Sequence, residues 1–443
     1  MYRILIAGTH SGCGKTTVTT GLLYALKQRG LDISAFKCGP DYIDPMFHRE
    51  AIGIPSYNLD PFFLNEEQLR RHFTAHHREI SIMEGVMGYY DGIGIEGRAS
   101  TYDIARMTNT PVILVINAKG MYTSAGAILQ GFLEYRQRSN IRGVVFNSIS
   151  QGMYTGLAQI AENAGVQPLG FLPNCEEIRI GSRHLGLVTA AELCDLQERI
   201  KKLGELAEQH MDINGILDIA KTAPVIREKS ALPAFVKKVP IAVAQDKAFC
   251  FIYPENIELM EAMGAEIIPF SPLEDKSLPE SIGGLYLCGG YPELYKEQLS
   301  QNHNLLKAIR NAVADGLPTI AECGGFMYLS ESLDGFPMVG ALPAKAYRTD
   351  KLQRFGYITL TARQDNLLCK AGENIPAHEF HYYDSTDCGN GFIAANAGNA
   401  REHQCIHARK TLYAGFPHLY FPANPAFAES FIRKAAEYVA RHA

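Results

Sequence analysis

A glycine-rich turn near the start of the chain constrains the fold more than any other feature. The stretch AGTHSGCGKTT, residues 7–17, follows the apolar run YRILI and precedes the helix-like run VTTGLLYAL. Such a turn suits a phosphate group, because glycines let backbone N–H groups approach the anion and the helix N-terminus adds positive potential. The stretch therefore predicts a strand, a phosphate loop and a helix, the first unit of a parallel α/β sheet.

The loop is a variant of the usual phosphate-binding pattern. The pattern G-x-x-x-x-G-K-[ST] requires glycine at position 9, where this chain has Thr9, and the glycine is Gly8 instead. Lys15 would reach the outer phosphates and Thr16 would hold Mg²⁺. The loop residues predicted to bind ATP are Gly12, Gly14, Lys15, Thr16 and Thr17. The alternative, a glycine-rich turn with an incidental lysine, is disfavoured by the strand before it and the helix after it.

Strand-like and helix-like runs alternate in both halves of the chain. In the first half, apolar β-rich runs begin at positions 2, 32, 79, 111, 142 and 167, and a second alternation covers residues 241–329. This alternation predicts parallel sheets covered by helices on both faces. A chain of 443 residues is also too long for one ordinary core. We therefore expect an α/β fold of two domains, residues 1–225 and 240–443, with a linker at 226–239.

Composition excludes several classes of function. The net charge is −5 and no basic block occurs, which argues against a nucleic-acid partner. No apolar run is long enough to span a bilayer, and the first one is too short for a signal peptide, so we expect a cytoplasmic protein without a membrane partner. The ten cysteines show no CxxC pair. We expect most of them to be free buried thiols rather than zinc ligands.

Acidic residues follow the second and third predicted strands. FKCGPDYIDP carries Lys37, Asp41 and Asp44, and SIMEGVMGYYDG carries Glu84 and Asp91. Ligands of open parallel sheets bind beyond the carboxyl ends of the strands, and Mg²⁺ prefers carboxylate and phosphate oxygens. The pattern predicts that these residues surround Mg²⁺ and a phosphoryl acceptor. The alternative is that each acid only caps a turn beside glycine or proline.

A second candidate site lies near position 323. Cys323 stands between the apolar run PTIAE and Gly324-Gly325, the pattern of a nucleophile elbow, in which a sharp turn exposes the sulfur and frees backbone N–H groups for an oxyanion. Gly290, in YLCGGYPE, is the second predicted oxyanion residue beside Gly324. We expect the helix N-terminus to lower the pKa of the Cys323 thiol. His418, in GFPHLYF, is the predicted base.

The alternative interpretation of this cysteine is a structural thiol. Cys288 also ends a strand-like run, but the chain after it continues into Pro292 rather than into a helix. We therefore favour Cys323 as the nucleophile.

Longer sequence motifs surround both the phosphate loop and the cysteine elbow. GTHSGCGKT, FKCGPDYIDP and MEGVMGYYDG resemble the dethiobiotin synthetase group of ATP-dependent enzymes, which share the displaced glycine. The second half resembles class I glutamine amidotransferase domains of the cobyric acid synthase type. In this order, and with SRHLGLV, GGYPELY, AECGGFMYL and HEFHYYDS, the two halves resemble the cobyrinic acid a,c-diamide synthase family over nearly the whole chain.

The resemblance implies an ATP- and Mg²⁺-dependent ligase that uses L-glutamine and a cobyrinic acid-type macrocycle. Glutamine would be hydrolysed through a cysteinyl thioester, and the released ammonia would displace phosphate from a phosphorylated macrocycle carboxylate. Hydrogenobyrinic acid and Ni-sirohydrochlorin remain alternative macrocycles. A non-catalytic nucleotide-binding regulatory protein is the second alternative, and a homodimer is left open.

The resemblance also assigns roles by motif position. It assigns the ATP phosphates to Lys15, Thr16 and Lys37, the adenine to Asn147, Mg²⁺ to Thr16, Asp41 and Glu84, the reacting carboxylate to Asp44 and Asp91, and the macrocycle to Tyr42, Arg183 and His184. Two departures occur. Tyr420 replaces the acid that many relatives have two positions after the histidine, so the group that orients His418 is left undefined. Asn117 stands where relatives often have aspartate, and we assign it no metal role.

Overall fold

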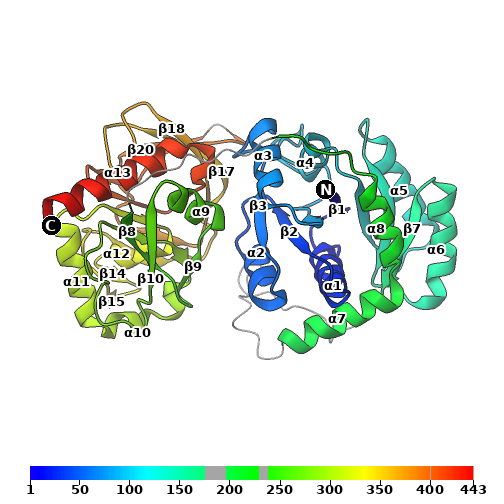
Figure 1. Cartoon of the computed structure of the whole chain (residues 1–443), viewed down its shortest axis with the longest axis horizontal. Coiled ribbons are helices and arrows are strands. Elements are labelled where there is room, and N and C mark those ends of the chain that lie inside the picture. Colours follow the sequence, from blue (N-terminus) through cyan, green and yellow to red (C-terminus); the bar gives the residue numbers. More distant parts are fainter. Residues whose placement is uncertain (175–195, 229–237, 400, 443) are drawn as a thin grey trace. The chain divides into compact units, whose positions relative to one another are not determined.

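The chain forms two compact units. The computed structural model describes residues 1–174, 196–228, 238–399 and 401–442, and it divides into Met1–Ser230 and Ala231–Ala443 (Figure 1). The division falls within the segment 226–239 that the sequence indicates as a linker.

The N-terminal unit is built on a parallel sheet of seven strands in the order β3-β2-β4-β1-β5-β6-β7. The strands are β1 (Tyr2–Gly8), β2 (Ile33–Cys38), β3 (Ser56–Leu59), β4 (Ile80–Glu84), β5 (Val112–Asn117), β6 (Ile141–Asn147) and β7 (Gln167–Leu172). All but β3, a short edge strand, begin within a few residues of the predicted positions. Ile6 and Lys37 both pair in register with Glu84, so the carboxyl ends of β1, β2 and β4 meet at one edge.

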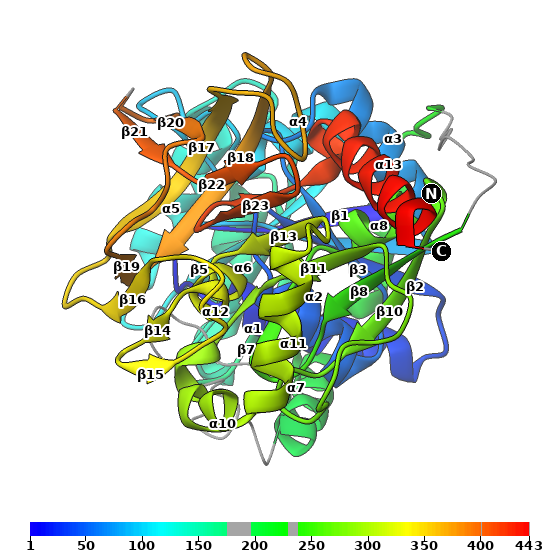
Figure 2. The same cartoon turned by 90° about the vertical axis from the view of Figure 1, so that its left-hand side faces the viewer.

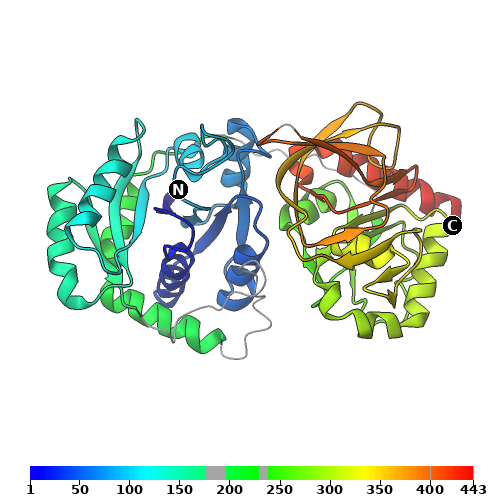
Figure 3. The same ribbon diagram turned by 180° about the vertical axis from the view of Figure 1, so that it is seen from behind.

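Helices pack around this sheet (Figure 3). They are α1 (Lys15–Gln28), α2 (Ile43–Phe47), α3 (Glu66–His76), α4 (Thr101–Thr108), α5 (Thr123–Glu134), α6 (Gln151–Asn163), α7 (Leu196–His210) and α8 (Ile213–Lys221), with a π-helical turn at His48–Ile52. Helix α1 begins after Gly14 (φ 106°) and ends before Gly30 (φ 75°), whose positive φ suits a helix C-terminus. Ile4 and Ile6 of β1 pack with Leu22 of α1 and Leu203 of α7 in one core.

The C-terminal unit contains a six-stranded sheet in the order β10-β8-β11-β13-β23-β22, parallel except for β22 (Figure 2). Its strands are β8 (Val239–Ala244), β10 (Ala265–Phe270), β11 (Gly284–Leu287), β13 (Thr319–Glu322), β22 (His407–Arg409) and β23 (Leu412–Gly415). The helices of this unit are α9 (Pro254–Ala262), α10 (Lys296–Gln301), α11 (His303–Ala314), α12 (Gly324–Leu329) and α13 (Pro425–His442).

An antiparallel sheet of five strands completes the C-terminal unit, in the order β21-β20-β17-β18-β24. The strands are β17 (Arg354–Ala362), β18 (Asn374–His381), β20 (Phe392–Asn396), β21 (Glu402–Cys405) and β24 (His418–Leu419). Strand–helix alternation did not predict this sheet, whose strands follow one another without helices. It pairs His418 with His378 in register and thereby fixes the backbone of the predicted base.

Candidate active sites

The phosphate loop is closed against the end of β6. A Cβ atom on Gly8 would lie 2.3 Å from Sγ of Cys13, and one on Gly14 would lie 2.0 Å from Nδ2 of Asn147. That same Nδ2 donates a hydrogen bond of 2.9 Å to the carbonyl of Cys13. The loop therefore needs glycine at both positions, and Asn147 lies directly beside the expected phosphate site.

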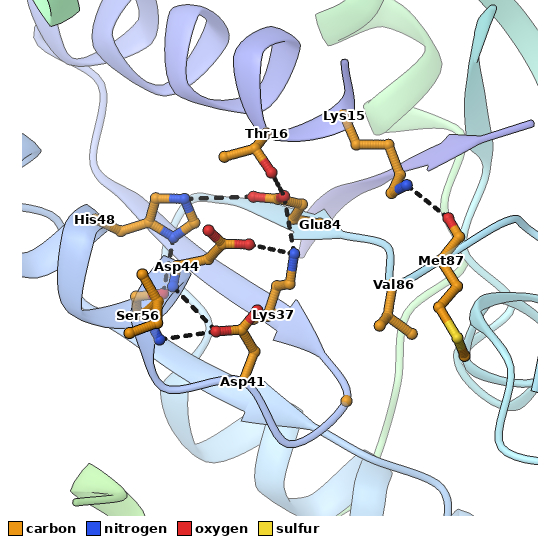
Figure 4. A network of polar contacts seen from close by, with 12 residues as sticks. Lys15, Thr16, Lys37, Asp41, Asp44, His48, Ser56, Glu84, Val86 and Met87 are labelled. Atoms are coloured by element: carbon orange, nitrogen blue, oxygen red, sulfur yellow. Dashed lines mark hydrogen bonds and ion pairs between the residues drawn. The ribbon is translucent and has the colours of Figure 1, made fainter. Parts of the chain in front are cut away.

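The ammonium group of Lys15 lies over this loop. Its Nζ donates to the carbonyl oxygen of His10 at 3.2 Å. It also donates to the carbonyl oxygen of Met87 at 2.5 Å (Figure 4). Lys15 is 7% exposed, and burial is the main reason why its pKa lies below the ordinary value. Both hydrogen-bond partners of this buried cation among the described residues are neutral carbonyls, so it is well suited to an anionic ligand.

The predicted metal and phosphate residues meet at the carboxyl ends of β2 and β4 (Figure 4). The Thr16 hydroxyl donates a 2.6 Å hydrogen bond to Oε1 of Glu84. Nζ of Lys37 lies 2.9 Å from the same oxygen and also forms an ion pair with Asp44. The structure thus brings together residues from α1, β2, α2 and β4.

This cluster contains more acidic than basic side chains. Lys37 faces the carboxylates of Asp41, Asp44 and Glu84 in the interior. Burial raises the pKa of Asp44, and the nearby Glu84 raises it further. Burial alone would raise the pKa of Glu84 as well, but Lys37 and His48 hold it below its ordinary value. The excess of carboxylates favours a further cation.

This cluster fits Mg²⁺. Among the described residues, no three His, Cys, Asp or Glu side chains form a complete metal site. Mg²⁺ takes few protein ligands and keeps water and phosphate oxygens. The hydroxyl of Thr16 and the carboxylate of Glu84, 2.6 Å apart beside the phosphate loop, supply hard oxygen ligands of that kind.

His48 belongs to this cluster, although the sequence analysis missed it. Its Nε2 lies 3.5 Å from Oε2 of Glu84, its Nδ1 lies 3.1 Å from the Ser56 hydroxyl, and its side chain is fully buried. The position seven residues after Asp41 gave no signal, because the π-helical turn that directs His48 back to β4 is not visible in hydrophobic periodicity.

Two of the predicted acids also act as caps. Oδ1 of Asp41 accepts the N–H groups of Ile43 and Asp44 at the start of α2, and Oδ2 of Asp91 accepts the N–H of Gly88 at 2.9 Å. The turn-cap alternative therefore describes their geometry. Asp44 makes no such cap. Asp44 forms an ion pair with Lys37 inside the cluster.

Asp91 instead lines a cavity of about 550 Å³ that also touches Thr9 of the phosphate loop. Aromatic rings of Tyr90, Phe132 and Tyr135 form part of its wall.

The remaining predicted residues lie elsewhere. Tyr42 immediately precedes α2. Arg183 and His184, assigned to the macrocycle, and the motif SRHLGLV lie outside the described residues. Thr17 lies in the first turn of α1.

In the C-terminal unit, Cys323 occupies a sharp turn between β13 and α12. Its φ of 48° and ψ of −101° are rare for a residue with a side chain. A Cβ on Gly324 would lie 3.0 Å from the backbone nitrogen of Gly290, and one on Gly290 would lie 2.1 Å from the Ala248 carbonyl. The predicted oxyanion residues, Gly290 and Gly324, are therefore neighbours beside Cys323.

The expected lowering of the thiol pKa is wrong for this conformation. Burial raises the pKa of Cys323 above its ordinary value, and Glu293 raises it further, so the effect of the helix N-terminus does not prevail. Burial also lowers the pKa of His418 to about 3, with His378 and His381 contributing. Both groups are neutral at pH 7. A thiolate would form only as the thiol transfers its proton.

Glu322 is the second functional candidate that the sequence analysis missed. It directly precedes Cys323, and its Oε2 lies 4.0 Å from Nδ1 of His418. Its Oε1 accepts the Leu419 N–H at 3.1 Å and its Oε2 accepts the Tyr286 hydroxyl at 3.0 Å. The acid absent at Tyr420 thus has a counterpart on β13. The sequence feature that could have indicated Glu322 is its position as a single acid at the end of an apolar strand.

The other candidate thiol has a structural environment. Cys288 is fully buried and its Sγ donates to the carbonyl of Ala244 at 3.3 Å. It does not lie at a strained turn. Of these two cysteines, Cys323, at the strained turn, is the better candidate for the reactive residue.

Two family models match the chain. Residues 4–188 match the CobQ/CobB/MinD/ParA nucleotide binding domain, and residues 240–426 match the CobB/CobQ-like glutamine amidotransferase domain. A P-loop nucleotide-binding unit followed by a glutamine amidotransferase unit defines a glutamine-dependent ligase.

Curated relatives match nearly the whole length of the chain. The cobyrinate a,c-diamide synthase of Caldanaerobacter subterraneus subsp. tengcongensis is 40% identical, over 94% of each chain. That of Clostridium acetobutylicum is 38% identical, over 98% of this chain and 100% of its own length. The chain belongs to the cobyrinate a,c-diamide synthase family, which confirms the resemblance and the two-domain α/β class. In the part of the chain that the structure describes, no helix has the length and apolarity needed to cross a membrane.

Proposed function

We propose that this protein uses ATP and glutamine to amidate the a and c side-chain carboxylates of cobyrinic acid. One observation carries the proposal: a single chain of this family holds both a phosphate loop with a carboxylate cluster and a cysteine elbow with two glycine N–H groups beside it. Hydrogenobyrinic acid and Ni-sirohydrochlorin are the alternative acceptors. The strained turn at Cys323 opposes a purely regulatory role, because such strain is retained mainly at functional sites.

In the amidotransferase unit, Cys323 attacks the carboxamide carbon of glutamine while its proton passes to His418. The N–H groups of Gly290 and Gly324 stabilise the oxyanion. His418 then protonates the departing nitrogen, so ammonia leaves and a glutamyl thioester remains. Water hydrolyses this thioester, with His418 as base, to release glutamate and restore the thiol. The carboxyl group of Glu322, beside Nδ1 of His418, orients the imidazole.

In the synthetase unit, Lys15 and the loop N–H groups hold the phosphates of ATP, and Asn147 contacts the base. A macrocycle carboxylate attacks the γ-phosphorus, which breaks the bond to ADP and forms an acyl phosphate. Ammonia attacks the acyl carbon, phosphate leaves, and an amide is formed. Mg²⁺ held by Thr16 and Glu84 would neutralise phosphate charge. Lys37 offsets the carboxylate charge as the phosphates enter.

The decisive experiment measures glutamate release and macrocycle products together. Purified protein is incubated with ATP, Mg²⁺, glutamine and each of the three macrocycles, and products with one and two added amides are resolved by mass spectrometry. Double amidation of cobyrinic acid with matching glutamate release is the expected result. Preference for another macrocycle would reassign the acceptor, and absence of ATP- and glutamine-dependent amidation of all three would overturn the proposal.

A further inference from the structure

Three acidic side chains raise the pKa of the Cys323 thiol, and two of them have polar partners. The three, in order of their effect, are Glu293, Glu322 and Glu379. Glu322 accepts hydrogen bonds from Leu419 and Tyr286, as described above. Oε1 of Glu379 lies 3.4 Å from Nε2 of His403.

Glu293 differs from both. It lies in the short 3₁₀ turn Pro292–Leu294, and its Oε2 is buried without a hydrogen-bond partner among the described residues. Burial raises the pKa of Glu293 to about 7. A buried carboxylate oxygen without a donor is costly, and native structures usually satisfy such groups.

The nearby cations do not supply that donor. Nζ of Lys296 lies 2.7 Å from Oδ2 of Asp334, which also accepts the hydroxyl of Tyr383. Arg348 is exposed and is engaged with Asp334 through its backbone N–H. Both cations reduce the effect of burial on the pKa of Glu293 only in part.

The backbone around Glu293 forms a wall of the predicted oxyanion site. A Cβ on Gly324 would lie 2.9 Å from Cδ of Pro292, the residue before Glu293, and 3.0 Å from the nitrogen of Gly290. A carboxamide bound between the glycine N–H groups would therefore have Glu293 nearby. The α-ammonium group of glutamine is separated from its carboxamide only by a short side chain, so its binding group must also lie near the thiol.

We propose that Glu293 binds the α-ammonium group of glutamine and makes the site selective for an α-amino substrate. This inference rests on the proposed glutaminase step at Cys323. Glu293 is a specificity-determining residue in this assignment: it takes no part in bond breaking and supplies the anion that pairs with the substrate's cation. The interaction is charge-assisted, so its loss weakens glutamine binding substantially.

The test compares glutamine with glutaramate, which is glutamine without its α-amino group. The kcat/KM of each amide is measured for the full-length protein, for Glu293→Gln and for Glu297→Gln, a matched change at an exposed glutamate in the first turn of α10. We expect Glu293→Gln to lower kcat/KM for glutamine on the order of 10- to 100-fold, leave that for glutaramate nearly unchanged, and so collapse the preference. Glu297→Gln should retain the wild-type preference.

Two outcomes separate this inference from the proposed function. If the wild type hydrolyses glutamine and Glu293→Gln keeps its preference over glutaramate, the role of Glu293 is overturned while the glutaminase step stands. If the wild type hydrolyses neither amide, the proposed function itself fails. Circular dichroism checks folding. Should Glu293→Gln not fold, Glu293→Ser removes the same charge from a smaller side chain, and a preference equal to that of the wild type would again overturn the role of Glu293.

Discussion

Glu322 and His418 lie side by side, with Oε2 of the carboxyl group 4.0 Å from Nδ1 of the imidazole. They come from different sheets, β13 and β24, and the Leu419 N–H that binds Glu322 joins the two. An acid from the strand before the nucleophile thus lies beside the histidine, whereas position 420, two residues after the histidine, is tyrosine. Because burial raises the pKa of Glu322 to about 8, the carboxyl group is protonated at pH 7.

This buried carboxyl group makes stability depend on pH. Its pKa is raised from 4.5 to about 8, so between these values the folded state keeps a proton that the unfolded state releases. The free energy of unfolding therefore falls as pH rises through this window, by up to about 1.4 kcal/mol per unit. Glu322→Gln removes the titration, so we expect the variant to gain stability relative to the wild type as pH rises from 5 to 8.

Hydrogen exchange of peptides from β13 and β23, compared at each pH, measures this gain within the C-terminal unit. Glu280→Gln, at an exposed position, is the control and should follow the wild type. A difference between Glu322→Gln and wild type that stays constant from pH 5 to 8 would contradict the raised pKa.

Cys323→Ser should abolish glutamine-dependent amidation and spare amidation driven by ammonium salts. The reason is that the elbow and the phosphate loop lie in separate compact units. We expect glutamate release to fall by several orders of magnitude, since covalent catalysis is lost. Cys288→Ser is a suitable control for cysteine removal, because that thiol is a buried donor to Ala244. Loss of ammonium-driven activity in a folded Cys323→Ser protein would argue against two independent sites.

Lys15→Ala should remove synthetase activity with either nitrogen source and leave basal glutamate release measurable. The ammonium group is the cation held over the phosphate loop by carbonyl oxygens, and the transition state of phosphoryl transfer depends on such charges. A loss of about 100-fold or more is expected. Lys119→Ala, at an exposed lysine of the same unit, serves as the control. Near-normal turnover of Lys15→Ala at saturating ATP would show that this loop is not the working phosphate site.

Asp91→Asn should affect the macrocycle more than ATP. Asp91 lines the cavity beside Thr9, and asparagine retains an oxygen that can accept the Gly88 N–H, so the cap survives while the charge is lost. We expect the KM for the macrocycle, or the ratio of mono- to diamide, to change severalfold with little change in ATP affinity. Weakened ATP binding with an unchanged product ratio would assign Asp91 to the loop structure alone.

Asp44→Asn should act differently, because Asp44 pairs with Lys37 within the carboxylate cluster. Removing its charge leaves Lys37 paired with Glu84, so we expect weaker Mg²⁺-dependent ATP binding as well as slower amidation. Calorimetric titration with ATP in the presence and absence of Mg²⁺ provides the measurement. Unaltered nucleotide binding together with a changed macrocycle KM would return Asp44 to the substrate side.

The sequence by itself determined the features that local chemistry encodes. Glycines at positions 12 and 14 are needed for positive φ, and the apolar runs around them define β1 and α1. Cys323 between an apolar strand and two glycines likewise defines the elbow. Such patterns are readable because each depends on residues close together in the chain.

Only the tertiary structure decided which distant groups share a site. His48 reaches Glu84 because a π-helical turn redirects the chain, and Glu322 reaches His418 because β13 and β24 end at the same place. The antiparallel sheet that holds β24 gives no helix-alternating signal. The direction of the pKa shift of Cys323 also could not be predicted from the sequence. It depends on the balance between the helix N-terminus, which is local, and burial by residues from the whole unit.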